Sequence, residues 1–298
     1  LASRFNLSFD FYSNTTYDML MSVNLPPSVG TTSMNVNFGQ LNNKGLDLSL
    51  SAQIIRNKDW FWSMTLTGGH VMDQIRKISQ GLKNDIDNPY DSSKPKILFV
   101  EGGSQYDIYA MRSAGIDPAT GKEIFIKKNG EYTFKYDENE RVAVRNTNPI
   151  LQGSWMNTVR YKGFSISLAT SYTFGSDYYN STLKNKVENI DLDYNVDRRV
   201  FTDRWKQPGD HTRFLGIGTS SSSSQYSERF VEKRNELYIS SIQVMYDFAP
   251  KAITRLGLRK LAIGFGLSDI AHISTVKFER GTDYPYCRGI NLIFRPTF

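Results

Sequence analysis

Hydrophobic and polar residues alternate strictly through residues 155–174, where two runs flank a short Lys-Gly connection at 162–163. Alternation with a period of two indicates β-strands, and a glycine in a two-residue connection is typical of a hairpin turn. Such a turn places Tyr161 opposite Phe164, so the large side chains of both strands share one face. Small side chains such as Ser167 occupy the other face. The same turn pairs Val159 with Ile166 and Trp155 with Thr170.

The second run of this hairpin is long for a soluble protein. Strands of soluble domains have roughly 5–6 residues, whereas a tilted membrane-spanning strand needs about 9–11. The alternation holds throughout Phe164–Phe174. A soluble β-sandwich would bury the large face against a second sheet, and a membrane barrel would turn it to lipid and place the serines in the lumen. The hairpin alone leaves both structures open.

The remaining chain repeats this pattern and decides between the two structures. The connections between strands are alternately short (55–59, 162–163 and 249–260) and long (20–42, 72–149, 176–235 and 271–284). Outer-membrane barrels have short periplasmic turns and long extracellular loops. The sequence therefore predicts an all-β, antiparallel transmembrane barrel with about eight strands. They are expected around Phe5–Phe11, Leu46–Ile54, Trp60–Leu66, Trp155–Tyr161, Phe164–Phe174, Tyr238–Phe248, Leu261–Leu267 and Ile290–Phe294.

Aromatic residues gather at the two ends of the predicted strands. Aromatic rings favour the headgroup level of a membrane, where they form two belts. We expect one belt beside the short turns and the C-terminus, and the other beside the long loops. The first would contain Trp60, Trp62, Tyr161, Phe164, Phe248 and Phe298, and the second would contain Tyr172, Phe174 and Tyr238.

Composition narrows the class of protein further. The 298 residues have a mean hydropathy of −0.44 and no apolar run near the roughly 18 residues of a membrane helix, which excludes a helical membrane protein. The net charge of +6 comes from basic residues scattered among acids, so no nucleic-acid partner is expected. The single cysteine, Cys287, excludes an internal disulfide. The sequence starts directly on a strand, so an exported protein would have lost its start by processing or continue beyond this piece.

No constellation of catalytic or metal-ligating residues is recognisable. The stretch from Asp191 to Asp197 has the spacing of an EF-hand start, but Val196 replaces the required glycine and Thr202 the final glutamate, which favours a solvated acidic loop. The three histidines lie far apart, and no nucleophile elbow or phosphate-binding glycine loop occurs. Neither an enzyme, a cofactor nor a bound metal is therefore expected.

Several segments resemble, in order, the C-terminal region of the SusC/RagA-type TonB-dependent outer-membrane transporters of Bacteroidota. The segments are YDMLMSVNLPPSVG, NFGQLNNKGLDLSLSAQ, SAGIDPATGKEIF, NTNPILQGSWMNTVRYKGF, DRWKQPGDHTRF and a last strand that ends in Phe298. Each motif is weak by itself, and their common order and spacing make the resemblance specific. The resemblance spans nearly the whole chain.

This resemblance implies a barrel of about 22 strands with a plugged lumen, of which residues 1–298 supply about eight C-terminal strands. The plug, the TonB-contacting segment and the earlier strands have no counterpart here. The resemblance further implies a bacterial outer-membrane location, a SusD-like lipoprotein lid, an oligosaccharide or peptide as cargo, and import driven by TonB through the plug. A structural or secretion-associated barrel without import activity is the alternative.

Candidate contact residues lie in the two longest loops, because binding residues concentrate on loops held by a rigid scaffold. Arg204 and Trp205 precede a Pro-Gly turn at 208–209. The favoured interpretation is a turn closed by an Arg–Asp contact, and the alternative is a loop edge that contacts a ligand or a partner protein. Loop tyrosines could stack on sugar rings or grip a peptide. These are Tyr106, Tyr109, Tyr178 and Tyr179.

Overall fold

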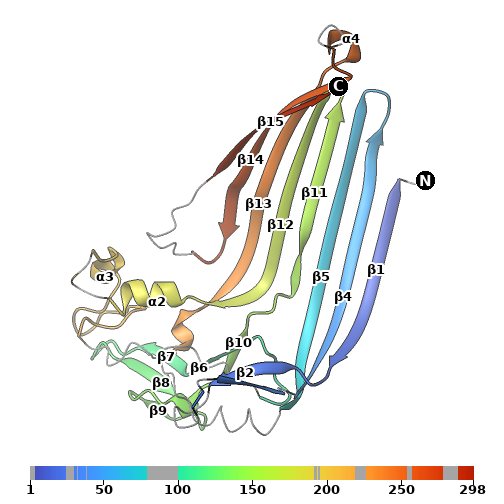
Figure 1. The fold of residues 1–298 in the computed structure, drawn as a ribbon. Helices are drawn as coiled ribbons and strands as arrows, with labels where there is room; N and C mark the ends of the chain where they lie inside the picture. Colours follow the sequence, from blue (N-terminus) through green and yellow to red (C-terminus); the bar gives the residue numbers. More distant parts are fainter. Residues whose placement is uncertain are drawn as a thin grey trace.

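Eight antiparallel strands form one large sheet, here called the wall, in the order β1-β4-β5-β11-β12-β13-β14-β15 (Figure 1). The prediction of about eight long strands is confirmed. Their bounds are β1 Phe5–Thr16, β4 Gly39–Arg56, β5 Trp60–Ile78, β11 Leu151–Tyr161, β12 Phe164–Tyr179, β13 Val231–Asp247, β14 Lys260–Ser274 and β15 Gly289–Thr297.

The structure is a computed structural model that describes residues 4–24, 30–31, 33–37, 39–78, 100–190, 193, 195–218, 226–253, 257–277 and 288–298. Three features of the sequence fall outside these residues: the serine run at 220–224, Cys287, and the start of the EF-hand-like stretch.

Short and long connections lie at opposite ends of the wall, as the alternation of their lengths predicts (Figure 1). The short end carries residues 57–59, 162–163 and 248–259, the last with the short helix α4 (Pro250–Ile253). The boundaries predicted for the two longest loops are too wide, because β5 continues to Ile78 and β12 to Tyr179. Outside the hydrocarbon both faces of a strand are polar. The alternation of apolar and polar residues therefore ends there, although the hydrogen-bonded pairing of the strands continues.

The long loops contain their own small elements. β2 (Leu20–Asn24) pairs with β3 (Ser33–Asn37), and β6 (Asp107–Ala110) pairs with β10 (Val142–Asn146). Strands β8 and β9 form a hairpin around Lys128–Gly130. The remaining elements are β7 Arg112–Ile116, β8 Glu123–Ile126, β9 Tyr132–Thr133, η2 Glu138–Glu140, α2 Ser181–Val187, α3 Arg199–Thr202 and η3 Glu228–Phe230.

One face of the wall is apolar, and rows of directly opposed residues cross it from strand to strand. The predicted pairs Tyr161–Phe164, Val159–Ile166 and Trp155–Thr170 are all present. Many large apolar side chains on this face are exposed, among them Phe265 at 40%, Ile166 at 49% and Leu292 at 86%, as expected for a surface that faces lipid. One row consists of Trp62, Val159, Ile166, Val244, Phe265 and Leu292.

The opposite face is polar and carries pairs of small hydroxyl side chains on neighbouring strands. Thr67 Oγ1 lies 2.8 Å from Ser154 Oγ, and Thr158 Oγ1 lies 3.3 Å from Ser167 Oγ. In a membrane barrel this face lines the lumen. The wall thus separates an apolar outer surface from a hydroxyl-rich inner one.

The aromatic belt beside the short turns is also present. Trp60, Tyr161, Phe164 and Tyr246 form one continuous row of opposed residues across β5, β11, β12 and β13. The ring centroids of Trp60 and Tyr161 lie 4.4 Å apart, and those of Phe164 and Tyr246 lie 4.5 Å apart. At the long-loop end, Tyr172 stacks on Phe174 with a centroid distance of 5.6 Å.

Two β-bulges correct the predicted faces. A bulge between Gln53 and Ile55 makes Ile55, rather than Ile54, the partner of Trp62. A second bulge at Ser240 leaves Ile239 and Ile242 on the apolar face. Tyr238 consequently lies opposite Ser171 on the polar face and does not belong to the second belt. A bulge adds one residue to the strand, so every later side chain points to the face opposite to the one that simple alternation predicts.

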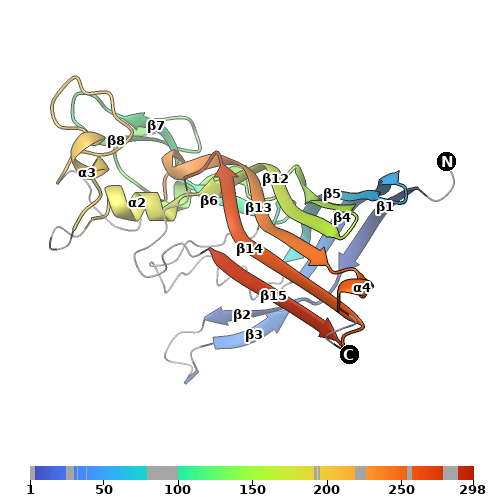
Figure 2. The same cartoon turned by 90° about the horizontal axis from the view of Figure 1, so that it is seen from above.

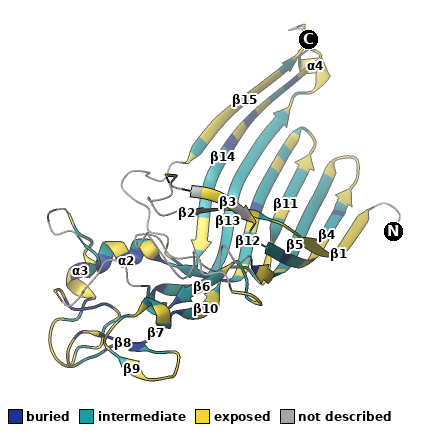
Figure 3. Cartoon of the chain, turned by 60° about the horizontal axis from the view of Figure 1, so that its bottom comes forward, coloured by how far each residue is buried: buried dark blue, intermediate teal, exposed yellow. Residues whose placement is uncertain are grey.

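The buried core of the chain lies mainly outside the wall. Wall strands are mostly half-buried or exposed, whereas residues such as Met111, Phe125, Val187 and Phe230 in the long loops are almost fully buried (Figure 3). No helix among the described residues has the length and apolar character needed to cross a membrane. Seen from above, the sheet bends between β1 and β15, which form its two free edges (Figure 2).

The two faces predict opposite responses to a charge. Leu168→Arg places a guanidinium on the apolar face near the middle of β12, and we expect it to cost about 2–4 kcal/mol of folding free energy in a bilayer. Ser167→Arg places the same group on the polar face and should cost much less. Urea titration of the intact barrel in lipid vesicles measures both, and equal losses would show that the faces are assigned incorrectly.

Candidate functional site

The two longest loops fold together into one unit at the long-loop end of the wall, here called the loop module. It comprises the described residues of segments 100–150 and 180–230. The two segments are joined through their backbones, because Met111 N–H donates to Tyr226 O at 2.9 Å and Glu228 N–H donates to Met111 O at 3.1 Å. Figure 1 shows the module below the wall, with α2, α3 and β7–β9 side by side.

Polar contacts fix the loop module to the long-loop end of β5. The carboxylate of Asp73 accepts hydrogen bonds from the Ser104 hydroxyl and, at 2.7 Å, from Gln105 N–H. The backbone of Ile75 exchanges hydrogen bonds with Gly102 and Gly103, each at 2.8 Å. Strand β5 therefore provides the support on which the module is built.

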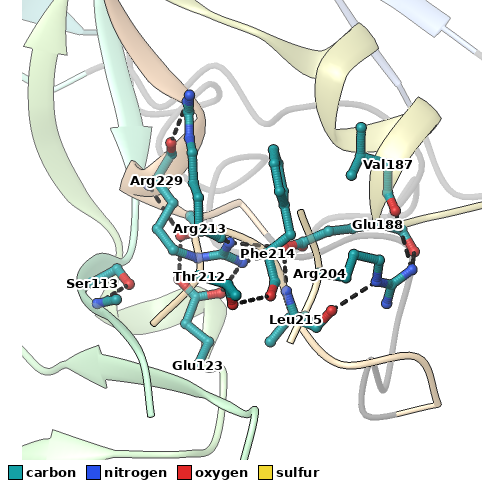
Figure 4. Close-up of polar contacts among 12 residues, drawn as sticks. Ser113, Glu123, Val187, Glu188, Arg204, Thr212, Arg213, Phe214, Leu215 and Arg229 are labelled. Carbon is teal, nitrogen blue, oxygen red and sulfur yellow. Dashed lines mark hydrogen bonds and ion pairs between the residues drawn. The ribbon is translucent and has the colours of Figure 1, made fainter. Parts of the chain in front are cut away.

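The centre of the loop module is a buried cluster of charged residues around Arg229 (Figure 4). Its guanidinium forms ion pairs with Glu123 at 2.7 Å and Glu188 at 2.8 Å, and all three side chains are almost completely buried. Ser227 also donates its hydroxyl to Glu123. Glu123 comes from the first long loop, while Glu188 and Arg229 come from the second. The cluster thus couples the two loops electrostatically.

A second cation, Lys184 of α2, lies beside this cluster. Its ammonium is 4.9 Å from the ring centroid of Tyr226. Burial lowers the pKa of Lys184 to about 8, although the neighbouring Glu188 carboxylate acts in the opposite direction. The module therefore contains a lysine that can lose its charge only slightly above neutral pH.

Arg204 is only 2% exposed and is a structural residue of the second loop. Its guanidinium donates to the carbonyl oxygens of Leu215 at 2.7 Å and Gly216 at 2.8 Å, and also to those of Val187 and Glu188 (Figure 4). The turn at 208–209 is not closed by an Arg–Asp pair. Instead, the Asp210 carboxylate accepts the backbone N–H groups of Lys206 and Gln207, which precede the turn, each at 3.0 Å. Arg204 therefore offers no surface to a ligand.

Trp205, by contrast, bridges the two long loops. Its indole Nε1 donates to Pro118 O at 2.9 Å, and its ring packs on Gly121, where a Cβ atom would lie 2.4 Å from the ring. Gly121 also has a φ of +68°, a conformation that other residues rarely adopt. The SAGIDPATGKEIF and DRWKQPGDHTRF segments quoted above therefore contact each other directly, and the half-buried Trp205 forms the contact.

The four candidate tyrosines occupy different environments. Tyr106 is 44% exposed, and Tyr109 and Tyr178 are half-buried. Tyr179 packs between Tyr226 and Phe230 against the apolar core of the loop module. Tyr106 is therefore the most exposed of the four. Among the described residues, no group of histidines, cysteines and carboxylates is arranged to hold a metal ion.

No protein-family model matches the sequence. It is 24% identical to the TonB-dependent receptor P39 of Formosa agariphila, in an alignment that covers 90% of this chain and 30% of that protein. It is also 24% identical to the TonB-dependent receptor SusC of Bacteroides thetaiotaomicron, over 83% of this chain and 25% of that protein. The chain thus spans less than a third of the length of these relatives.

The fold is similar to that of the RagAB peptide transporter, with a TM-score of 0.75 and 20% identity over 92% of this chain and 30% of that one. The open state of the RagAB peptide importer gives a TM-score of 0.73 with 23% identity. The chain is thus similar in sequence to part of the SusC-type TonB-dependent receptors and similar in fold to part of the RagAB peptide transporter. The names of these relatives are those of receptors and transporters rather than of enzymes.

The resemblance drawn from ordered motifs is confirmed, but the residues that organise the loop module of this SusC-like chain were missed. Glu123 and Arg229 are 106 residues apart, and a single glutamate or arginine in a polar loop gives no sign of burial. The one available signal was that both long loops contain segments that resemble the transporter family, which suggests that a shared constraint acts on their residues.

The buried cluster gives a prediction for the stability of the loop module. Arg229→Met leaves the carboxylates of Glu123 and Glu188 buried without their cation, which should cost about 3–5 kcal/mol locally. Amide hydrogen exchange of β8 and α2 in the intact protein measures this loss of protection. The control is Arg145→Met, which breaks a 4.0 Å contact between Arg145 and Glu228 at the surface. It should cost about 0–1 kcal/mol, and unchanged protection in Arg229→Met would contradict the assigned role of the cluster.

Proposed function

We propose that this chain is part of an outer-membrane importer that takes up nutrients under the control of TonB. The observation that carries the proposal is the likeness of fold to a peptide transporter along 92% of the chain. Sequence relatives named as TonB-dependent receptors support it independently. The wall supplies part of a membrane barrel, and the loop module supplies its extracellular end.

The proposed import function also implies which partners the protein has. The cargo is an oligosaccharide or a peptide, and a SusD-like surface lipoprotein covers the extracellular opening as a lid. TonB acts through a plug that lies outside this sequence. The loop module is suited to such contacts because its fold is fixed from within: its own core and ion pairs hold it, so its outer surface is free to bind.

The outer surface of the module carries the aromatic contact area that such partners need. Tyr106 and Trp205 remain the best individual contact residues, and Tyr109 and Tyr178 are secondary ones. Aromatic side chains dominate the energetics of protein interfaces because they bury large areas with few rotatable bonds. Further exposed apolar residues of the module are Tyr132, Phe134, Phe201 and Ile217.

A deletion tests this assignment. Because Arg229 and Glu123 connect the two loops, removing either loop alone would damage the other. We therefore expect removal of both loops together to abolish lid association and cargo uptake while the barrel still inserts. Pull-down of the lipoprotein and uptake of labelled cargo by whole cells measure the two effects. Shortening the α4 connection at the opposite end is the control and should change neither. Survival of both activities in the loop deletion would favour a barrel with a purely structural role.

We further propose that β1 and β15 each pair with strands that are not part of this sequence. Among the described residues β1 pairs only with β4 and β15 only with β14, so the outer backbone groups of both are unpaired. Hydrocarbon contains no water to satisfy them, and each unsatisfied group would cost several kcal/mol. Paired neighbours would complete the barrel.

Hydrogen exchange tests the pairing of these edges. In the intact protein embedded in membrane, the amides of Phe5–Phe11 and Ile290–Phe294 should be protected about as strongly as those of the central strand β12, because both edges are then paired. In an isolated 1–298 chain they should exchange much faster than those of β12. Fast exchange in the intact protein would show that the edges stay open, and a cross-link between β1 and β15 would show that they close on each other.

A further inference from the structure

A cavity of about 530 Å³ lies where the second long loop meets the segment that follows β14. This volume is typical of pockets that hold a small molecule or the end of a larger one, which are roughly 300–1,000 Å³. The charged and titratable residues of its lining come from three parts of the chain. They are Arg199, Asp203, His211, Arg213, Glu232 and Lys277.

The inner side of this pocket is held in place by packing and hydrogen bonds. Leu183 and Phe214 line it and belong to the apolar core cluster of the loop module. Asn180 fixes the adjacent start of α2, since its side-chain oxygen accepts Leu183 N–H at 2.9 Å. Its amide nitrogen donates to Glu232 at 3.0 Å, which holds that carboxylate in place. The pocket is therefore preformed and needs little rearrangement to bind a ligand.

Three cations, Arg199, Arg213 and Lys277, line the pocket together with the carboxylates of Asp203 and Glu232. Arg199 is held by Asp197 through contacts of 2.9 and 2.6 Å. These hydrogen bonds, with a smaller contribution from the charge of Lys277, keep the pKa of Asp197 well below its usual range. Lys277 itself is exposed and makes no hydrogen bond or ion pair with the described residues. The ammonium group of Lys277 is therefore available to bind an anion.

Arg213 supplies the second cation, and only some of its guanidinium N–H donors form hydrogen bonds with the described residues. Its Nη2 donates to Glu232 at 2.8 Å and to Arg229 O at 3.0 Å, so within the described part of the chain one nitrogen of the guanidinium carries both bonds. A guanidinium has five donors and is suited to planar anions. Figure 4 shows Arg213 beside Phe214 and Arg229 of the buried cluster.

We propose that this pocket binds a carboxylate group of the cargo between Arg213 and Lys277. The inference rests on the proposed import function, and it adds that the preferred cargo is anionic. The carboxylate could belong to the C-terminus of a peptide or to a uronic acid of an oligosaccharide. Arg213 and Lys277 come from different loops, so a bound carboxylate would also join the second long loop to the segment after β14.

Two matched pairs of probes test the pocket on the purified full-length transporter by calorimetry. One pair is tetra-alanine with a free C-terminus and its C-terminal amide. The other is an oligosaccharide ending in glucuronate and the same oligosaccharide ending in glucose. We expect the acid of at least one pair to bind about tenfold more tightly than its neutral partner, as for one charge-assisted hydrogen bond. The pair that discriminates identifies the source of the carboxylate.

The double variant Arg213→Gln/Lys277→Gln should remove this discrimination. Lys277→Gln alone should reduce it, and since Lys277 is exposed and makes none of the module's contacts, this variant keeps the fold. The matched control is Lys58→Gln in the short turn at the opposite end, which should bind like the parent. The proposal is overturned if neither pair discriminates or if discrimination persists in the double variant. Failure of import itself would appear separately, as absence of uptake of any probe by whole cells.

Discussion

The whole structure depends on one constraint, which is that a backbone inside hydrocarbon must satisfy its own hydrogen bonds. The wall meets it by pairing eight strands in a continuous antiparallel sheet. Everything else about the wall follows from that pairing: opposed residues share a face, apolar rows cross from strand to strand, and small hydroxyls remain on the other side. The wall needs no buried core, because lipid takes that role on one face.

The loop module obeys a different rule, because it is surrounded by water. It has a dry core of its own, built from residues such as Phe125, Val187, Phe214 and Phe230. Buried ion pairs around Arg229 give this core a defined arrangement, since two carboxylates from different loops must meet one guanidinium. Such pairs contribute little net stability, but their geometry excludes other ways of packing the loops.

These two parts explain how one end of a sheet can hold a specific surface in place. Asp73 and Ile75 continue β5 beyond the membrane and fasten the module to the wall through its first loop. The second loop is then positioned by the first, through Trp205 and the charged cluster. The charged pocket lies at the far side of this chain of contacts, where the second loop meets the segment after β14.

The sequence by itself determined the wall. Strict alternation, the sequence of short and long connections and the aromatic positions are local signals, because a strand in a membrane has the same two environments along its whole length. They yielded the strands and the hairpin register at Tyr161–Phe164, while the ordered sequence motifs yielded the family resemblance. They failed at Tyr238 and Ile54, where a single extra residue reverses the faces.

Only the tertiary structure decided the loops. Glu123, Glu188 and Arg229 read as ordinary charged loop residues, and Arg204 reads as an exposed contact residue although four backbone carbonyls surround it. Burial of a charge depends on partners that are distant in sequence, and no periodicity marks them. Alternation reports the solvent on each side of a strand, whereas the placement of a loop side chain is set by the segments that fold against it.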